Sequence, residues 1–164
     1  MVTMNKRGVI LGSSICFFIL ALVLPFAQAE EYDITNCGSA IMTTLYTSNE
    51  LTILTMDNKG IVFSNSPDKT FENFTYQCVG VLRVAEGKPI ATGYCKYLSP
   101  EGDIIVGEFY NVGPDGNWKF SHGTGKWKGI TGGGKSKPIA SGNPIVPGTT
   151  QSCMRATGTY ELPK

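Results

Sequence analysis

Short runs of apolar and β-branched residues, separated by turn-forming residues at near-regular intervals, make up the chain beyond its first 29 residues. These runs predict strands over residues 40–47, 51–56, 61–64, 74–84, 89–98, 104–111, 117–121 and 154–162. Gly, Pro, Asn and Asp between such runs are typical of antiparallel structure. No segment after residue 29 shows sustained helical periodicity, so the pattern predicts an all-β protein.

The connections expected between these strands differ in length. Residues 30–36 read as a polar lead-in, and Asp57–Gly60 reads as a turn. Residues 135–150 contain three prolines among several Gly and Ser residues, which predicts an extended surface loop. A lid over a barrel mouth is the alternative interpretation of that loop.

About eight short strands in one domain fit either a β-sandwich or a barrel. Few residues in the predicted strands would protect an exposed sheet edge, and closing the sheet removes its edges. We therefore expect a small antiparallel barrel over residues 30–164, with a β-sandwich as the alternative.

The first 29 residues predict a signal peptide. Lys6 and Arg7 precede an apolar run from Gly8 to Leu24, and Ala27-Gln28-Ala29 has the small-x-small form of a cleavage site. An uncleaved membrane anchor is the alternative, because the run is near the minimum length for a span. Ile15 before Cys16 argues against a lipoprotein signal. We expect a secreted or periplasmic protein that begins at Glu30 and has no membrane contact after cleavage.

Charge gives little indication of a partner. The formal net charge is +1, and loss of the leader's two basic residues changes it to −1. A chain without a basic excess is not expected to bind nucleic acid or an anionic membrane surface. The oligomeric state is not indicated.

Four cysteines remain after the leader, and an even number in an exported chain predicts disulfides. If residues 85–88 form a hairpin loop, Cys78 lies directly opposite Cys95, close enough for a cross-strand bridge. Cys37 and Cys153 would then pair and close a very long loop, worth about 4–5 kcal/mol in the chain-entropy model. The cysteines lack the close pairs of zinc sites, so we predict no metal site.

A glycine-rich run, GTGKWKGITGGG, spans residues 123–134. Glycine accepts positive φ and close backbone approach, so the run is interpreted as a structural motif. Its principal residues are Gly123, Gly125, Trp127, Gly129, Gly132 and Gly134.

Residues 74–164 resemble the allene oxide cyclase and dirigent-like β-barrels. The resemblance is carried by the glycine-rich run and by Gly93–Tyr97 with the following Gly102-Asp103 and Gly107–Phe109. Within this group the chain is most similar to uncharacterised bacterial exported proteins with the same glycine motif. It implies an eight-stranded barrel of the allene oxide cyclase or calycin type. His122 stands where the dirigent pattern has a further glycine, and no active-site residue of those families can be matched here.

Candidate chemistry is sparse. His122 is the only histidine and precedes a glycine turn, so a surface role is expected over that of a lone general base. Thr124-Gly125-Lys126 lacks the spacing and the following helix of a phosphate-binding loop. Asp33, Asp103 and Glu108 are acidic candidates without a predicted partner carboxylate.

Aromatic residues on the predicted strands could line an interior cavity, with simple core packing as the alternative. The candidates are Tyr94, Tyr97, Phe109 and Trp118. The sequence favours a non-enzymatic binding module for a small apolar ligand or a protein partner, without a cofactor. A cyclase or isomerase that uses the cavity, and a structural protein without a pocket, remain as alternatives.

Overall fold

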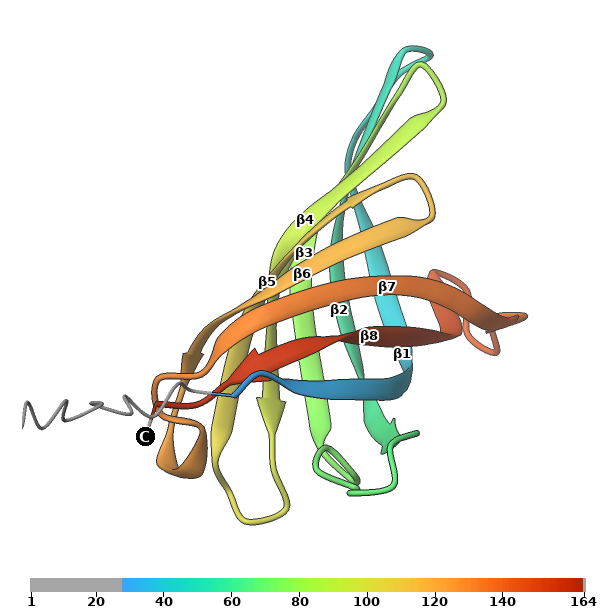
Figure 1. The fold of residues 1–164 in the computed structure, drawn as a ribbon. Coiled ribbons are helices and arrows are strands. Elements are labelled where there is room, and N and C mark those ends of the chain that lie inside the picture. Colours follow the sequence, from blue (N-terminus) through green and yellow to red (C-terminus); the bar gives the residue numbers. More distant parts are fainter. Residues whose placement is uncertain (1–27, 164) are drawn as a thin grey trace, which may run out of the picture.

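Eight antiparallel strands form a closed barrel in which each strand pairs with the next and the last pairs with the first (Figure 1). The computed structural model describes residues 28–163, so most of the predicted signal peptide lies outside the described residues. The strands are β1 (Glu30–Thr47), β2 (Leu51–Ser64), β3 (Thr75–Ala85), β4 (Lys88–Leu98), β5 (Ile104–Val112), β6 (Asp115–Gly123), β7 (Thr131–Gly142) and β8 (Thr149–Glu161). A single 3-10 turn, η1 (Gly125–Trp127), follows β6. In this part of the chain no helix has the length and apolar character needed to cross a membrane. Closure of the sheet confirms the predicted barrel over the β-sandwich.

The hairpin of β3 and β4 has the predicted register. Val84 lies opposite Pro89, and Cys78 lies opposite Cys95. The loop is shorter than predicted, because Ala85 and Lys88 themselves pair. Glu86 and Gly87 form the two-residue turn with φ of 52° and 71°. Positive φ at both positions is the requirement of a type I′ turn, whose twist matches that of the flanking strands.

Two segments that were predicted to be irregular form parts of strands. Residues 30–36 are the start of β1, where Tyr32 and Ile34 are buried between more exposed neighbours. The predicted turn Asp57–Gly60 lies inside β2 and pairs with both β1 and β3. There Asp57 and Lys59 form an ion pair on the outer face, which is compatible with an extended chain.

The prediction of a long surface loop over residues 135–150 was wrong. Strand β7 continues to Gly142, and only residues 143–148 connect it to β8. Pro138 fits within β7 because the pairing with β6 ends at Ser136, which leaves that side of β7 without a partner. Proline lacks the N–H that an inner strand would need, and an unpaired side tolerates it. The six-residue connection that remains gives no basis for a lid.

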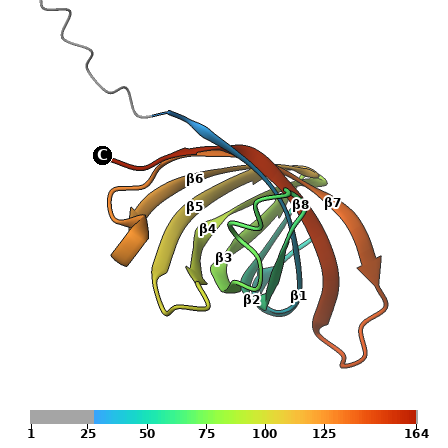
Figure 2. The same cartoon turned by 60° about the horizontal axis from the view of Figure 1, so that its bottom comes forward.

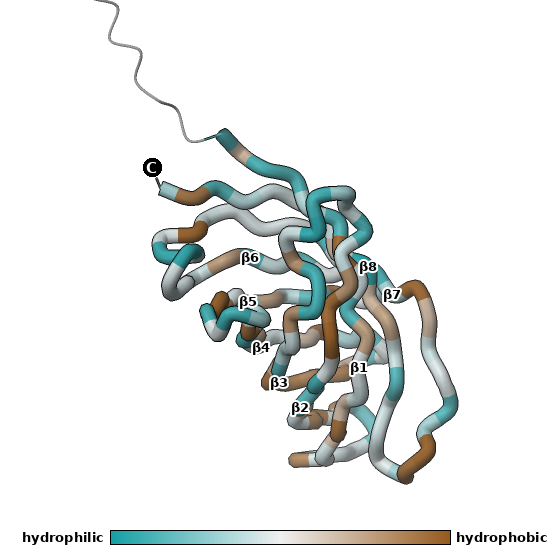
Figure 3. Tube along the Cα trace, turned by 90° about the horizontal axis from the view of Figure 1, so that it is seen from below, coloured by the Kyte–Doolittle hydropathy of each residue, from teal (hydrophilic) through white to brown (hydrophobic). Residues whose placement is uncertain are grey.

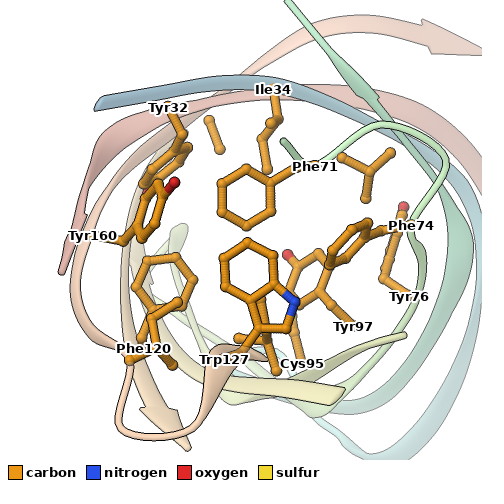
Figure 4. Packing of buried hydrophobic residues seen from close by; sticks show 14 of the residues in the cluster. Tyr32, Ile34, Phe71, Phe74, Tyr76, Cys95, Tyr97, Phe120, Trp127 and Tyr160 are labelled. Carbon is orange, nitrogen blue, oxygen red and sulfur yellow. The ribbon is translucent and has the colours of Figure 1, made fainter. Parts of the chain in front are cut away.

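Aromatic rings close one end of the barrel. Figure 2 brings this end forward, and Figure 4 shows Phe71 and Trp127 at the centre of a circle of buried side chains. Their rings stack with centroids 5.2 Å apart, and the indole is 2% exposed. Phe74 and Tyr160 pack edge-on against this pair. We call the cluster of Phe71, Phe74, Trp127 and Tyr160 the aromatic plug.

Inward-facing glycines lie directly opposite one another at three places in the sheet. The pairs are Gly38 with Gly60, Gly80 with Gly93 and Gly134 with Gly158. A Cβ atom at Gly158 would lie 2.7 Å from the Gly134 Cα and 2.7 Å from the Tyr32 hydroxyl. The paired glycines therefore let neighbouring strands approach closely and leave room for aromatic side chains inside the barrel.

Buried and more exposed positions alternate along much of β3 and β4, and apolar and polar residues are interspersed along the tube in Figure 3. The inner positions fill the plug and the cavity described below. The outer face also carries apolar residues. Examples are Val79 on β3, Tyr94 on β4 and Tyr110 on β5, which are each about half exposed. Such alternation is typical of an antiparallel sheet with one covered face.

Candidate functional site: an uncharged cavity inside the barrel

A cavity of about 210 Å³ lies in the barrel between the aromatic plug and the end that carries the β3–β4 turn. It is lined by Asn36, Ala40, Met56, Asn58, Tyr76, Cys78, Cys95, Tyr97, Phe109, Asn111, Trp118, Ser136, Thr150, Ser152, Met154 and Ala156. These side chains come from all eight strands. None of these lining residues is an Asp, Glu, Lys, Arg or His.

Three asparagines give this cavity its polar character. The side-chain oxygens of Asn36, Asn58 and Asn111 are buried and have no hydrogen-bond partner. Buried polar atoms in proteins are normally paired, so three unpaired oxygens with almost no accessible surface are unusual. No motif in the sequence marks any of the three as a site residue.

Aromatic rings form the apolar part of the wall. Tyr97 lies between Tyr76 and Trp118, with ring centroids 5.8 Å and 5.4 Å away. The Trp118 indole N–H donates to the Tyr32 hydroxyl over 2.6 Å, which fixes the indole in place. Tyr32 itself packs edge-on against Phe71, so it connects Trp118 of the cavity wall to the plug.

Burial keeps the interior tyrosines protonated. It raises the pKa of Tyr76 and, more strongly, that of Tyr97, which also lies near the hydroxyls of Tyr76 and Tyr32. The amides of Asn58 and Asn36 oppose these shifts from beside the Tyr76 and Tyr97 hydroxyls. Neither amide oxygen, however, makes a hydrogen bond of good geometry there. The wall therefore offers neutral donors and acceptors near neutral pH.

The structure separates the four aromatic residues that the sequence suggested for a cavity. Tyr97, Phe109 and Trp118 line it. Tyr94 does not, since it is 57% exposed on the outer face. It lines a shallow groove on that face with Tyr110 instead. Successive strand residues point to opposite faces, so Cys95 and Tyr97 being inside requires Tyr94 to be outside.

The glycine-rich run forms the connection from β6 through η1 to β7 at the plugged end. Gly125 and Gly129 have φ of 53° and 79°, conformations that side chains other than glycine rarely adopt. Between them, Trp127 turns into the plug, and Ile130 is also buried. Gly132 has φ of 103°, and Gly123 packs against the Trp127 backbone. The run carries the indole to the centre of the barrel end and lies away from the cavity lining.

Two disulfides join neighbouring strands, with the pairing expected from the sequence. Cys78–Cys95 links β3 to β4 and forms part of the cavity wall. Cys37–Cys153 links β1 to β8 across the closure of the barrel, with Cα atoms 4.1 Å apart. Two disulfides indicate an oxidising compartment.

The acid and base candidates from the sequence lie outside the cavity. His122 is exposed on β6, and Glu108 is exposed on β5. The Arg155 guanidinium bonds both carboxylate oxygens of Asp33 and lowers the pKa of that carboxyl. Asp103 accepts a hydrogen bond from the Lys126 backbone N–H. The structure brings none of them together.

Comparison with solved structures shows a dirigent-like fold. The barrel is similar to the pterocarpan synthase dirigent protein GePTS1, with a TM-score of 0.53 and 12% sequence identity, over 93% of this chain and 100% of that chain. For the pterocarpan synthase dirigent protein PsPTS1 the TM-score is 0.49 at 11% identity, over 84% of this chain and 96% of that chain. No protein-family model and no curated protein matches the chain. At this identity the likeness establishes the fold and agrees with the resemblance of the glycine-rich run.

Proposed function

We propose that this protein is an exported binding protein that holds a small neutral molecule inside its barrel. The observation that carries the proposal is the uncharged interior cavity, whose walls combine aromatic rings with asparagine, serine and threonine side chains. Ligand sites are typically concave, mainly apolar and supplied with a few convergent polar groups. The predicted leader and the two disulfides support a location outside the cytoplasm.

Binding is favoured over proton-transfer chemistry by the ionisation state of the wall. The titratable groups that line the cavity, apart from the bridged cysteines, are Tyr76 and Tyr97. Burial raises the pKa of both phenols further above neutrality, so neither would act as a general base there. A cyclase or isomerase of the kind the sequence left open would need another group to move a proton.

A matched pair of variants tests the proposal. Ser152→Phe places a ring in the cavity, whereas Ser39→Phe places one on the exposed outer face of the neighbouring strand. Native mass spectrometry of protein purified from its own host should find a bound small molecule in the wild type and in Ser39→Phe. Ser152→Phe should lack it. Retention of the same bound mass by a folded Ser152→Phe variant would contradict the proposal.

The outer face supports a second candidate, a protein partner. Val79, Val81, Tyr94 and Tyr110 are each more than 40% exposed on adjacent strands, and aromatic residues are enriched at interfaces. Tyr94→Ser combined with Tyr110→Ser should abolish such binding in a pull-down from the host's exported fraction and leave the thermal melt unchanged. Recovery of the same partners by the double variant would exclude this face.

A further inference from the structure

A groove of about 540 Å³ lies on the outer face of the barrel, over β6, β7 and β8. It includes the last pair that joins β6 to β7, Gly116 with Ser136, beyond which the two strands separate (Figure 1). The lining residues are Asp115, Gly116, Asn117, Lys135, Ser136, Lys137, Arg155 and Thr157. Three of these side chains are cations and one is a carboxylate, so the groove attracts anions.

Two of the cations face each other across neighbouring strands. Lys137 of β7 lies directly opposite Arg155 of β8, and like charges in such a position repel each other. Among the paired strand residues that the structure describes, the other directly opposed pair of charged residues is Glu108 with Lys119, which is attractive. Lys135 lies two residues from Lys137 on the same face of β7 and adds to the positive charge. A local conflict of this kind is expected at a functional site.

The cations of the groove are available to a ligand. Neither Lys135 nor Lys137 makes an ion pair with a residue that the structure describes. Arg155 is held by Asp33, whose carboxylate accepts from Nε over 2.9 Å and also from Nη2. This contact orients the guanidinium and leaves the Nη1 hydrogens for a further acceptor. Guanidinium and ammonium groups form their strongest hydrogen bonds with carboxylate and phosphate oxygens.

We propose that the groove binds a small organic oxyanion, through a carboxylate or phosphate group that contacts Lys135, Lys137 and Arg155. Its volume is within the roughly 300–1,000 Å³ typical of sites for drug-sized molecules, so there is room for an organic part beside the anionic group. Asn117 and Thr157 offer hydrogen-bonding groups to that part. The site opens on the outer face, and it does not depend on the ligand proposed for the interior cavity.

Three sugars that differ only at C6 test the inference: glucose 6-phosphate, glucuronate and glucose. NMR titration of the nitrogen-15-labelled protein shows where each sugar binds and how tightly. The two anions should shift the amide signals of residues 115–117, 135–137 and 155–157, whereas glucose should leave them in place. The anion that binds more tightly identifies phosphate or carboxylate as the preferred group. Higher salt should weaken the binding of both anions, because the site is exposed.

Four variants locate the site. Lys137→Gln should weaken the binding of both anions by about two- to fivefold, the worth of an exposed ion pair. Lys96→Gln is the matched control, because it removes the same charge from an exposed position on β4 outside the groove and should leave the affinity unchanged. Asp115→Asn should tighten binding by a similar factor, since it removes a repulsive charge. Ser152→Phe, which fills the interior cavity, should bind both anions as the wild type does.

Several results would overturn the inference. Equal affinities for glucose and the two anions would show that the groove does not recognise an oxyanion. Equal losses in Lys96→Gln and Lys137→Gln would show that the attraction is spread over the whole surface. Lysines beside an unpaired strand edge also prevent edge pairing, and a Lys137→Gln variant that self-associates but binds both anions as the wild type does would support that role instead. Binding to phosphatidylglycerol vesicles without binding of either soluble anion would assign the groove to a membrane surface.

Discussion

Replacing Asn111 with leucine should make the ligand-free protein more stable. The Asn111 side-chain oxygen is buried in the cavity wall without a partner, and such an atom costs about 1–3 kcal/mol. Leucine has a similar size and carries no polar atom. We therefore expect the free energy of unfolding to rise by roughly 1–3 kcal/mol.

The control for this change is Asn117→Leu. Asn117 lies exposed on β6, opposite Tyr110 of β5 and Lys135 of β7. Asparagine is disfavoured in strands by up to about 1 kcal/mol, and both variants gain from its removal. Only Asn111→Leu also removes the unpaired oxygen. The excess of its stabilisation over that of Asn117→Leu therefore measures the cost of the cavity amide.

Urea denaturation followed by tryptophan fluorescence gives the free energies, with the disulfides oxidised and the protein refolded beforehand to remove bound molecules. Thermal melts should agree, because 1 kcal/mol corresponds to roughly 2–4 °C for a domain of about 150 residues. If Asn111→Leu gains no more than Asn117→Leu, the amide oxygen is already satisfied, by water for example.

Three further predictions concern the plug, the interior tyrosines and the barrel closure. Trp127→Ala should lower the free energy of unfolding in urea by about 3–5 kcal/mol, because the indole is buried against Phe71. Replacing the exposed Lys128 with alanine should change it by no more than about 0.5 kcal/mol. Equal effects of the two changes would contradict the structural role of the glycine-rich run. Burial raises the pKa of Tyr32 from 10.0 to about 12, so its contribution to stability is present below pH 10 and is lost as the pH rises towards 12. Tyr32→Phe should therefore flatten the fall in unfolding free energy between pH 10 and pH 12. An unchanged slope would refute this assignment. Replacing both Cys37 and Cys153 with serine opens a link across a sequence separation of 116 and should lower the unfolding free energy by about 4–5 kcal/mol, which an unchanged urea midpoint would disprove.

The parts of the fold that the sequence predicted well depend on local geometry. The register of the β3–β4 hairpin follows from the turn at Glu86-Gly87, and this register places Cys78 opposite Cys95. The pairing of Cys37 with Cys153 then follows by elimination. A short turn fixes the pairing register of the two strands that it joins, so this register can be predicted from a few neighbouring residues.

Strand β7 could not be predicted in the same way. Pro138 argues against a strand unless one side of that strand lacks a partner, and β7 lacks one beyond Ser136 only because β6 ends its pairing there. The opposed glycines Gly134 and Gly158 are likewise far apart in sequence and meet only in the closed sheet. Both glycines leave room for the Tyr32 hydroxyl, and this contact exists only in the folded barrel.

No sequence pattern indicated the three cavity asparagines, because their surroundings are typical of element boundaries. Asn36 ended the supposed lead-in, Asn58 lay in the supposed turn, and Asn111 ended a predicted strand, so the sequence pattern put an element boundary at each of them. Asparagine favours turns, yet all three residues lie within paired strands and face the interior. A local preference that is opposed at three inward positions of one cavity, each with an unpaired oxygen, costs stability at every position. Functional sites are where such conflicts are expected, because binding requires groups that folding alone would exclude.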